Sequence, residues 1–281
     1  MLTAGICAYN EGRSIGKAIA SVLPQLGSND ELIVVASGCT DSTAPVVREI
    51  AEKDARVRLM EEPERRGKSS AINFILKNAK GGTIVLTDAD VIVGSGAIKA
   101  LEERLEESGA GAVIASTCPY KTENFFDRLQ AFAWRAFNST RAEQSQSGEL
   151  FALNGYLSAL RAGIVEQIPE GNLVEDWLLG WEIKKAGHAV LYEPRAEVYV
   201  QAAQNLGDYI RQKERVRTGQ WQMRREGMKL SYLRKPVHLK HLLKSPYALP
   251  YLALDAAILA KAFLNFSTGR RAWEPVASSK I

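Results

Sequence analysis

The sequence has few cysteines and histidines, and none of them is arranged as a metal site would require. Its 281 residues include three cysteines and three histidines, with no Cys-x-x-Cys and no zinc-ligand spacing. Cys7, Cys39 and Cys118 are scattered, which argues against a disulfide-rich secreted fold and favours a reducing compartment. The N-terminus enters a strand pattern at once without a basic leader, so we expect no signal peptide and a cytoplasmic location.

Long apolar runs are also scarce. In the longest stretch with few charges, residues 247–266, only Asp255 and Lys261 are charged. The length would suffice to cross a bilayer, but Pro250 and the two charges argue against a span. We expect instead an amphipathic helix that packs on its own domain, on a partner subunit in a homodimer or peripherally on the cytoplasmic face of a membrane.

What the chain does have is an ordinary globular composition, with 46% hydrophobic and 24% charged residues. Its net charge is only +4, but residues 211–244 hold eleven Lys and Arg against two acids. Such a segment favours phosphate-bearing partners, which leaves open a non-enzymatic protein that binds anionic lipid or nucleic acid. Trp221 and Tyr232 are too few for a base-stacking platform, so we expect no nucleic acid.

Apolar runs and helix-capping patterns alternate through the first 120 residues. We predict strands over 2–8, 31–36, 57–60, 84–86 and 112–116, and helices over 13–23, 43–54, 67–78 and 97–107. After Pro119 we predict a long helix over 124–144 with inward-facing aromatic residues, a strand over 156–161, a helix over 176–186 and a strand over 189–192.

This alternation predicts an α/β fold with a mostly parallel, Rossmann-like sheet flanked by helices. We place the catalytic domain at residues 1–204 and a helical, basic and apolar C-terminal extension at residues 205–281.

The most informative motif is Asp88-Ala89-Asp90, which follows an apolar strand pattern. Ligands bind at the carboxyl ends of strands in open parallel sheets, so both carboxylates should face a crevice. Paired carboxylates suit Mg²⁺ or Mn²⁺ carrying a diphosphate, because such ions leave positions free for phosphate oxygens.

Four other segments have polar residues suited to a ligand. Ala8-Tyr9-Asn10-Glu11 and the segment from Ser37 to Thr43 follow the first two predicted strands. Lys68 follows Arg65, Arg66 and Gly67 at a predicted helix start, where cations and free backbone N–H groups suit a diphosphate. Glu175, Asp176 and Trp177 open another helix, where a carboxylate can act as a general base beside an aromatic ring that stacks on a sugar. Each segment also has an ordinary explanation as a turn or cap.

In this order, the five segments resemble the family 2 glycosyltransferases, which are inverting enzymes with the GT-A fold. The resemblance runs from Leu2 to about Trp221. It implies that a nucleoside-diphosphate sugar is bound by a set that combines backbone and side-chain contacts: Ala8, Tyr9, Asn10, Glu11, Ser37, Lys68, Asp88, Ala89, Arg215 and Arg217.

The resemblance also implies the other roles in the site. Asp90 ligates the metal together with Asp88, and Asp176, helped by Glu175, deprotonates the acceptor hydroxyl. Gly155, Tyr156 and Trp177 would bind the acceptor, a glycan or a lipid-linked molecule of the cell envelope.

Two departures from the family pattern narrow the expected function. Ala36-Ser37 stands where many members have paired aspartates, one of which binds the base, so a uridine donor is in doubt. Gln212 and Arg215 match the Gln-x-x-Arg-Trp of processive members, but Val216 replaces the Trp. We therefore expect a single transfer rather than polymer synthesis.

Two other enzyme classes share parts of this pattern. Gly94-Ser95-Gly96 resembles part of a dinucleotide fingerprint, but it lies in mid-domain and its third glycine is missing. A sugar nucleotidyltransferase would share the fold type and the metal pair. It usually opens with a glycine-rich phosphate loop, which Ala8-Tyr9-Asn10-Glu11 does not provide.

Overall fold

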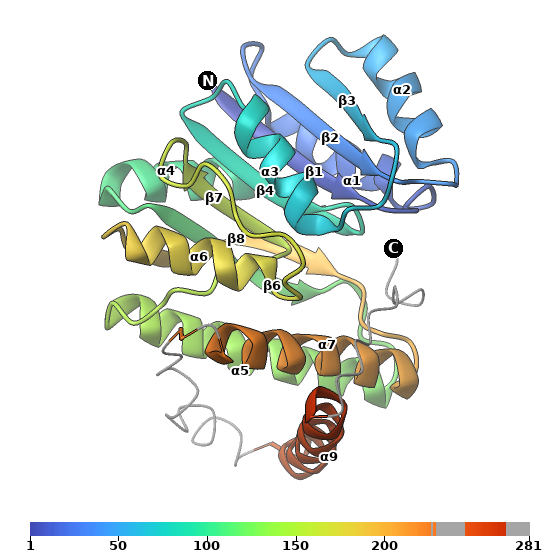
Figure 1. Cartoon of the computed structure of the whole chain (residues 1–281), viewed down its shortest axis with the longest axis vertical. Helices are drawn as coiled ribbons and strands as arrows, with labels where there is room; N and C mark the ends of the chain where they lie inside the picture. Colours follow the sequence, from blue (N-terminus) through green and yellow to red (C-terminus); the bar gives the residue numbers. More distant parts are fainter. Residues whose placement is uncertain (226, 229–244, 268–281) are drawn as a thin grey trace.

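The computed structural model describes residues 1–225, 227–228 and 245–267 (Figure 1). In these ranges the strands are β1 (Leu2–Ala8), β2 (Glu31–Ser37), β3 (Val57–Glu62), β4 (Thr83–Asp88), β5 (Val91–Val93), β6 (Ala112–Pro119), β7 (Leu157–Arg161) and β8 (Val190–Val200). The helices are α1 (Ile15–Val22), the short 3-10 helix η1 (Leu23–Gln25), α2 (Thr43–Lys53), α3 (Lys68–Asn78), α4 (Ala97–Ser108), α5 (Phe125–Gln146), α6 (Glu175–Lys185), α7 (Leu206–Arg225) and α9 (Ala248–Ser267).

One sheet contains all eight of these strands, in the order β3-β2-β1-β4-β7-β6-β8-β5. The pairs among β1, β2, β3 and β4 are parallel, as is the β6–β8 pair, whereas β7 runs antiparallel to both β4 and β6. The predicted α/β class with a mainly parallel sheet is therefore confirmed. The reversed β7 and the short edge strand β5, antiparallel to β8, were not predicted.

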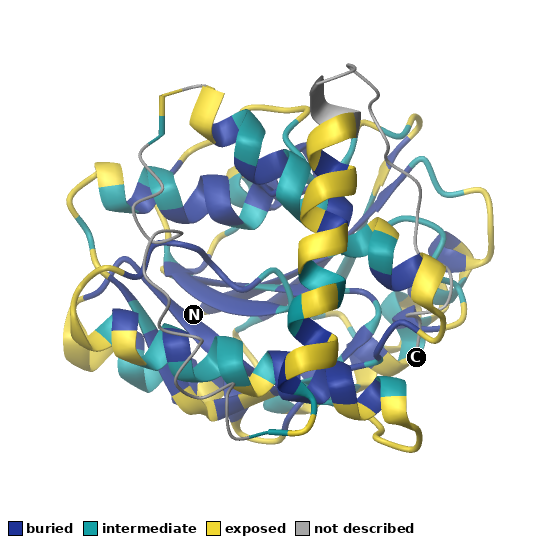
Figure 2. Cartoon of the chain, turned by 90° about the horizontal axis from the view of Figure 1, so that it is seen from below, coloured by how far each residue is buried: buried dark blue, intermediate teal, exposed yellow. Residues whose placement is uncertain are grey.

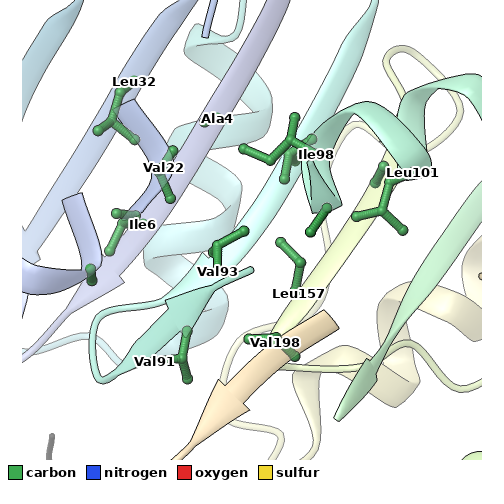
Figure 3. Close-up of a cluster of buried hydrophobic side chains, with 14 of the residues drawn as sticks. Ala4, Ile6, Val22, Leu32, Val91, Val93, Ile98, Leu101, Leu157 and Val198 are labelled. Atoms are coloured by element: carbon green, nitrogen blue, oxygen red, sulfur yellow. The ribbon is translucent and has the colours of Figure 1, made fainter. Parts of the chain in front are cut away.

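Two apolar clusters cover the two faces of the sheet. On one face, α1 and α4 pack against alternating residues of β1 and β2, such as Ala4, Ile6 and Leu32 (Figure 3). On the other face, α3 covers Ile33 and Val35 of β2, and α6 contacts β8 further along the same sheet. Because β1 and β2 are buried on both faces, they form the rigid centre of the sheet.

The long helix α5 begins at a capping box. The side chain of Asn124 accepts a hydrogen bond from the backbone N–H of Asp127, and the side chain of Asp127 accepts from the backbone N–H of Asn124 in return. The inward direction predicted for its aromatic residues holds for Phe132, which is buried, but is wrong for Phe125, which is 59% exposed. Phe125 is in the first turn of the helix, and its ring lies 5.4 Å from that of Tyr247.

The described part of the C-terminal region packs on α5 through aromatic rings. Phe126 meets Tyr209 of α7 edge-on at 5.4 Å, and Phe132 meets Tyr251 of α9 edge-on at 6.1 Å. The helix predicted over 247–266 thus packs on its own chain, and no helix among the described residues is long and apolar enough to cross a bilayer. Residues 226 and 229–244 of the basic segment lie outside the described residues, as do residues 268–281. The boundary at residue 204 stays a prediction.

Candidate active site

The polar segments that follow β1, β2 and β4 meet at one edge of the sheet. In the register of the sheet, Cys7 lies opposite Asp88 and Ala8 lies opposite Ala36. Ser37 at the end of β2 lies opposite Glu62 at the end of β3. Four strand ends therefore deliver their side chains to the same crevice, as a parallel sheet requires.

Side-chain hydrogen bonds hold the first two loops at this edge together. Asn10, with a left-handed φ of 54°, accepts a hydrogen bond from the backbone N–H of Thr40 through Oδ1 at 2.8 Å. Its own backbone N–H lies 3.4 Å from Sγ of Cys39, and the N–H of Glu11 donates to Thr43 Oγ1 at 2.7 Å. We call this set of bonds between residues 10–11 and 39–43 the loop clasp. Three of the predicted nucleotide-pocket residues, Tyr9, Asn10 and Glu11, are in or beside it.

An aromatic ring and a guanidinium group are stacked next to the loop clasp. The guanidinium carbon of Arg65 lies 3.9 Å from the centroid of the Tyr9 ring. Gly38, with a φ of 60°, permits this, because a Cβ there would come within 2.4 Å of the backbone nitrogen of Arg65. Ser37 is 4% exposed, and its Oγ has no hydrogen-bond partner among the described residues. A buried hydroxyl of this kind can pair with a polar edge of a ligand.

The two aspartates lie where β4 ends and β5 begins. Burial, together with the negative charges of Asp88 and Glu11, raises the pKa of Asp90 to about 7. A cation that binds beside such a carboxyl group stabilises its ionised form. Asp88 and Asp90 therefore fit a divalent metal ion. Ala89, between them, is 2% exposed and belongs to the apolar core, which leaves only its backbone to face a ligand.

The donor set fits an ion that takes only a few protein ligands. Among the described residues, no cluster of three or more His, Cys, Asp or Glu side chains could hold a metal. Two carboxylates at a strand end would leave most positions of Mg²⁺ or Mn²⁺ to phosphate oxygens and water.

Lys68 joins the aspartate segment to α6. Its Nζ lies 2.5 Å from Oδ1 of Asp88 and 3.4 Å from Oε1 of Glu175. Burial alone would lower the pKa of Lys68, but the carboxylates of Asp88 and Glu175 raise it above its usual value. The ammonium group therefore stays charged and links two acidic segments that are almost 90 residues apart in the sequence.

Asp176 is positioned as an acid–base group at the start of α6. Burial and the charge of the neighbouring Glu175 raise its pKa to about 6, against the opposing effect of Lys68 and Arg215. A Cβ on Gly155 would lie 3.2 Å from Oδ2 of Asp176, so the glycine keeps the space beside this carboxylate open. At neutral pH the carboxylate can accept a proton from an alcohol that occupies this space.

The buried side-chain amide of Asn154 fixes the segment around Gly155. Asn154 donates from Nδ2 to the carbonyl of Ala115 at 2.9 Å and to Thr117 Oγ1 at 3.0 Å, and its Oδ1 accepts from the N–H of Tyr156 at 3.1 Å. The hydroxyl of Thr87 donates to the carbonyl of Tyr156 at 2.7 Å. These bonds position Gly155 beside Asp176. Burial and the charges of Asp90 and Asp88 raise the pKa of the neighbouring Tyr156 phenol to about 12, so this phenol is directed toward the aspartate pair. The resemblance placed Asn154 at the start of the acceptor-side segment 154–161 but gave no role to its amide, which only the structure shows.

Comparison with known proteins agrees with this geometry. Residues 3–168, more than half of the chain, match the model of the family described as "Glycosyl transferase family 2". The chain belongs to this family. The predicted family and the predicted enzyme class, a glycosyltransferase, are therefore confirmed.

Relatives and solved structures of the family extend the match. Poly-beta-1,6-N-acetyl-D-glucosamine synthase of Staphylococcus aureus (strain COL) is 23% identical over 215 residues, which cover 75% of this chain and 52% of that protein. The chain thus spans about half the length of the curated relatives it matches.

Two solved structures show the same fold. The mannosyltransferase PcManGT from Pyrobaculum calidifontis, in complex with GDP-Man and Mn²⁺, is 25% identical with a TM-score of 0.68, and the match covers 95% of this chain and 79% of that one. Glucosyl-3-phosphoglycerate synthase from Mycobacterium tuberculosis, with Mn²⁺ and UDP-Glc, is 20% identical with a TM-score of 0.57, covering 81% and 79%. The GT-A fold predicted for this family 2 chain is confirmed.

Not all residues predicted for the family 2 site come together. Trp177 is 9% exposed and packs edge-on against Phe151 at 5.5 Å, so its ring lies in the core rather than beside an acceptor. Arg217 pairs with both carboxylate oxygens of Asp255 in α9 at 2.9 Å, away from the strand ends. Arg215 influences the pKa of both Asp176 and Tyr156, and its Nε is buried without a hydrogen-bond partner among the described residues. Of the two arginines predicted to bind the donor, only Arg215 is near the carboxylate of Asp176 in the site.

Proposed function

We propose that this chain is an inverting glycosyltransferase that moves one sugar from a nucleoside-diphosphate sugar to an acceptor hydroxyl, with Mg²⁺ or Mn²⁺ as cofactor. The observation that carries the proposal is the Lys68 bridge. One lysine side chain contacts both Asp88 and Glu175. The Asp88 segment suits a metal-bound diphosphate, and the Glu175–Asp176 pair suits acid–base catalysis, so the two functions lie next to each other.

On the donor side, Asp88 and Asp90 would hold the metal, which supplies positive charge to the leaving diphosphate when bound. The stack of Tyr9 and Arg65 offers a flat surface for the base, and Ser37 a polar partner for it. Arg215 has a buried N–H without a partner among the described residues, which suits a phosphate oxygen.

On the acceptor side, Asp176 takes the proton of the acceptor hydroxyl as its oxygen forms a bond to the anomeric carbon. The bond from that carbon to the diphosphate oxygen breaks at the same time and leaves the electron pair on the diphosphate. Attack from the face opposite the leaving group inverts the configuration. Gly155 and Asp176 line one cavity, and we assign Gly155 and the adjoining Tyr156 to the acceptor.

Several features support the finer parts of the proposal. The compared structures hold GDP-Man or UDP-Glc with Mn²⁺, which makes this donor class the first to test. Val216, where processive members have Trp, packs against Trp177 and other core residues, so it offers no stacking surface to a growing polymer. The curated relatives are polysaccharide synthases, which favours a glycan or lipid-linked acceptor of the cell envelope. We propose that the enzyme acts in the cytoplasm, as a monomer or as a homodimer.

Two matched variants test the division of labour. Asp90→Asn should abolish Mn²⁺-dependent stabilisation by the donor sugar, because it removes a metal ligand. Asp176→Asn should keep that stabilisation and lower the transfer rate by about 10²-fold or more, because it removes the base. Donor binding is read from thermal unfolding with a panel of nucleotide sugars and either metal, and transfer from release of the nucleoside diphosphate.

The exposed Glu107→Gln serves as the control and should change neither readout. Equal loss of donor binding in both variants would contradict the proposed roles. Release of pyrophosphate from a nucleoside triphosphate and a sugar phosphate would favour a nucleotidyltransferase instead.

A further inference from the structure

The outer face of α9 is apolar and largely exposed, although Phe263 near its end also meets Trp221 of α7 edge-on at 5.7 Å. The four large apolar side chains exposed on it are Leu249 at 76%, Leu259 at 44%, Phe263 at 60% and Leu264 at 63%. Every other exposed position between 248 and 264 is Ala or Pro except Lys261. Figure 2 shows this exposed side of α9 in front of the rest of the molecule.

The charged residues of α9 are directed toward its own chain. Asp255 pairs with Arg217 at 2.9 Å, and Lys261 pairs with Glu214, which is buried, at 3.1 Å. The inner residues Tyr251, Ile258 and Ala262 are buried. The helix is thus held by α7 and α5 on one side and presents a continuous apolar stripe on the other, which is the pattern of an interfacial helix.

Cations that neighbour α9 in the sequence indicate the kind of surface that it fits. In the sequence, residues 227–247 before the helix contain five Lys and Arg and no acid, and Arg270 and Arg271 follow it. Arg224 and Arg225 at the end of α7 are exposed as well. An anionic lipid surface attracts such cations, whereas a second copy of this chain would bring the same cations together.

The position of α9 permits such contact. It lies at the end of the long axis opposite α2 (Figure 1), so a flat surface can reach it without touching the strand ends of the active site. We propose that the exposed face of α9 docks on an anionic lipid membrane, with the helix axis parallel to its surface. This docking is independent of the reaction that the active site performs.

Vesicle co-sedimentation of the full chain tests the proposal. The protein should pellet with vesicles that contain a mixture of phosphatidylglycerol and phosphatidylcholine. Its affinity for vesicles of pure phosphatidylcholine should be at least ten-fold lower. A triple variant, Leu249→Gln, Ala256→Gln and Ala260→Gln, should bind the anionic vesicles at least ten-fold more weakly, because it places three polar amides along the stripe without changing the charge. Leu249→Gln alone should give a smaller loss in the same direction.

Ala20→Gln, at an exposed position of α1, is the matched control and should bind like the unchanged protein. Thermal unfolding of all variants should stay within a few degrees, since every substituted side chain is exposed. Equal vesicle binding by the triple variant and the control would overturn the proposal, as would no binding by the unchanged protein. A dimer in solution that only the triple variant dissociates would assign the face to a second copy and would overturn it too. Loss of transferase activity has no bearing on these outcomes.

Discussion

The N-terminal half, formed by β1 to β4 with α1 to α3, and the C-terminal layer, formed by α5, α7 and α9, are built in different ways. In the N-terminal half, strands buried on both faces fix the positions of the polar loops, and the loop clasp joins two of those loops directly. In the C-terminal layer, aromatic rings and exposed or half-buried ion pairs hold helices to one another. The comparison indicates that the loops proposed to bind the donor are fixed by the sheet, whereas α7, which carries Arg215, is positioned by helix packing.

The largest effect is expected where α6 joins the two regions. A Cβ on Gly180 would lie 1.8 Å from the carbonyl oxygen of Phe151, so Gly180→Ala must push α6 away from its support. We expect a loss of about 3 kcal/mol in the free energy of unfolding, measured by chemical denaturation, because backbone atoms cannot yield as side chains do.

Gly16→Ala in α1 is the matched control, since its new Cβ would meet only Val46 at 3.8 Å. It should stabilise the protein by about 0.5–1 kcal/mol, as alanine does in a helix. Similar destabilisation by both substitutions would mean that the two regions tolerate an added side chain equally well, against the prediction.

The second effect concerns the link between the regions. Lys68→Gln removes the cation between Asp88 and Glu175, so it should lower kcat/KM by about 10²-fold or more, or about 3 kcal/mol in transition-state stabilisation. It should also lower the free energy of unfolding, because Glu175, 5% exposed, loses its counter-ion. Lys77→Gln, an exposed position of the same helix, should change neither quantity. Unchanged kinetics for Lys68→Gln would show that the ion pairs are structural alone.

The third effect is the pH dependence of transfer. Asp176 must be ionised to accept a proton, and its pKa is raised to about 6 by burial and by Glu175. The rate should therefore fall about ten-fold for each pH unit below about 6. Glu175→Gln removes the like charge, so the acid limb of the profile should move to lower pH. A move to higher pH would contradict the proposed interaction.

The smallest effect is expected within the C-terminal layer. Arg217→Ala breaks a half-buried ion pair with Asp255, in which the two side chains are 24% and 28% exposed. We expect a loss of about 0.5–1 kcal/mol in the free energy of unfolding and no change in donor binding. Arg224→Ala, an exposed position of the same helix, should have less effect still. Loss of donor binding in Arg217→Ala would contradict this prediction and would assign Arg217 to the donor site.

The sequence predicted the N-terminal half more closely than the rest, for physical reasons. Buried β-branched runs and helix caps mark β1, β2 and α2 locally, and the structure begins and ends these elements within one or two residues of the predicted bounds. The direction of β7 could not be predicted, because it depends on where α5 returns the chain. The predicted strand at 189–192 continues to Val200 despite Pro194, across a bulge in its pairing with β6.

Within the site, residue types could be predicted from the sequence, but the directions of their side chains could not. Asp88 and Asp176 are near Lys68, as the order of the motifs implied. Trp177 is buried against Phe151, and Arg217 pairs with Asp255. Both contacts join segments that are more than 20 residues apart, so they depend on how the helices and loops pack in three dimensions. No sequence period reports such contacts.

The loop clasp has a consequence for ligand affinity. Asn10 is held in a backbone conformation that few residues other than glycine adopt, and its amide side chain is already bonded across to Thr40. A ligand that enters between these loops meets a surface whose shape is set in advance, so little of its binding energy is spent on ordering the chain. Discrimination between ligands at this edge should therefore depend on fit rather than on induced folding.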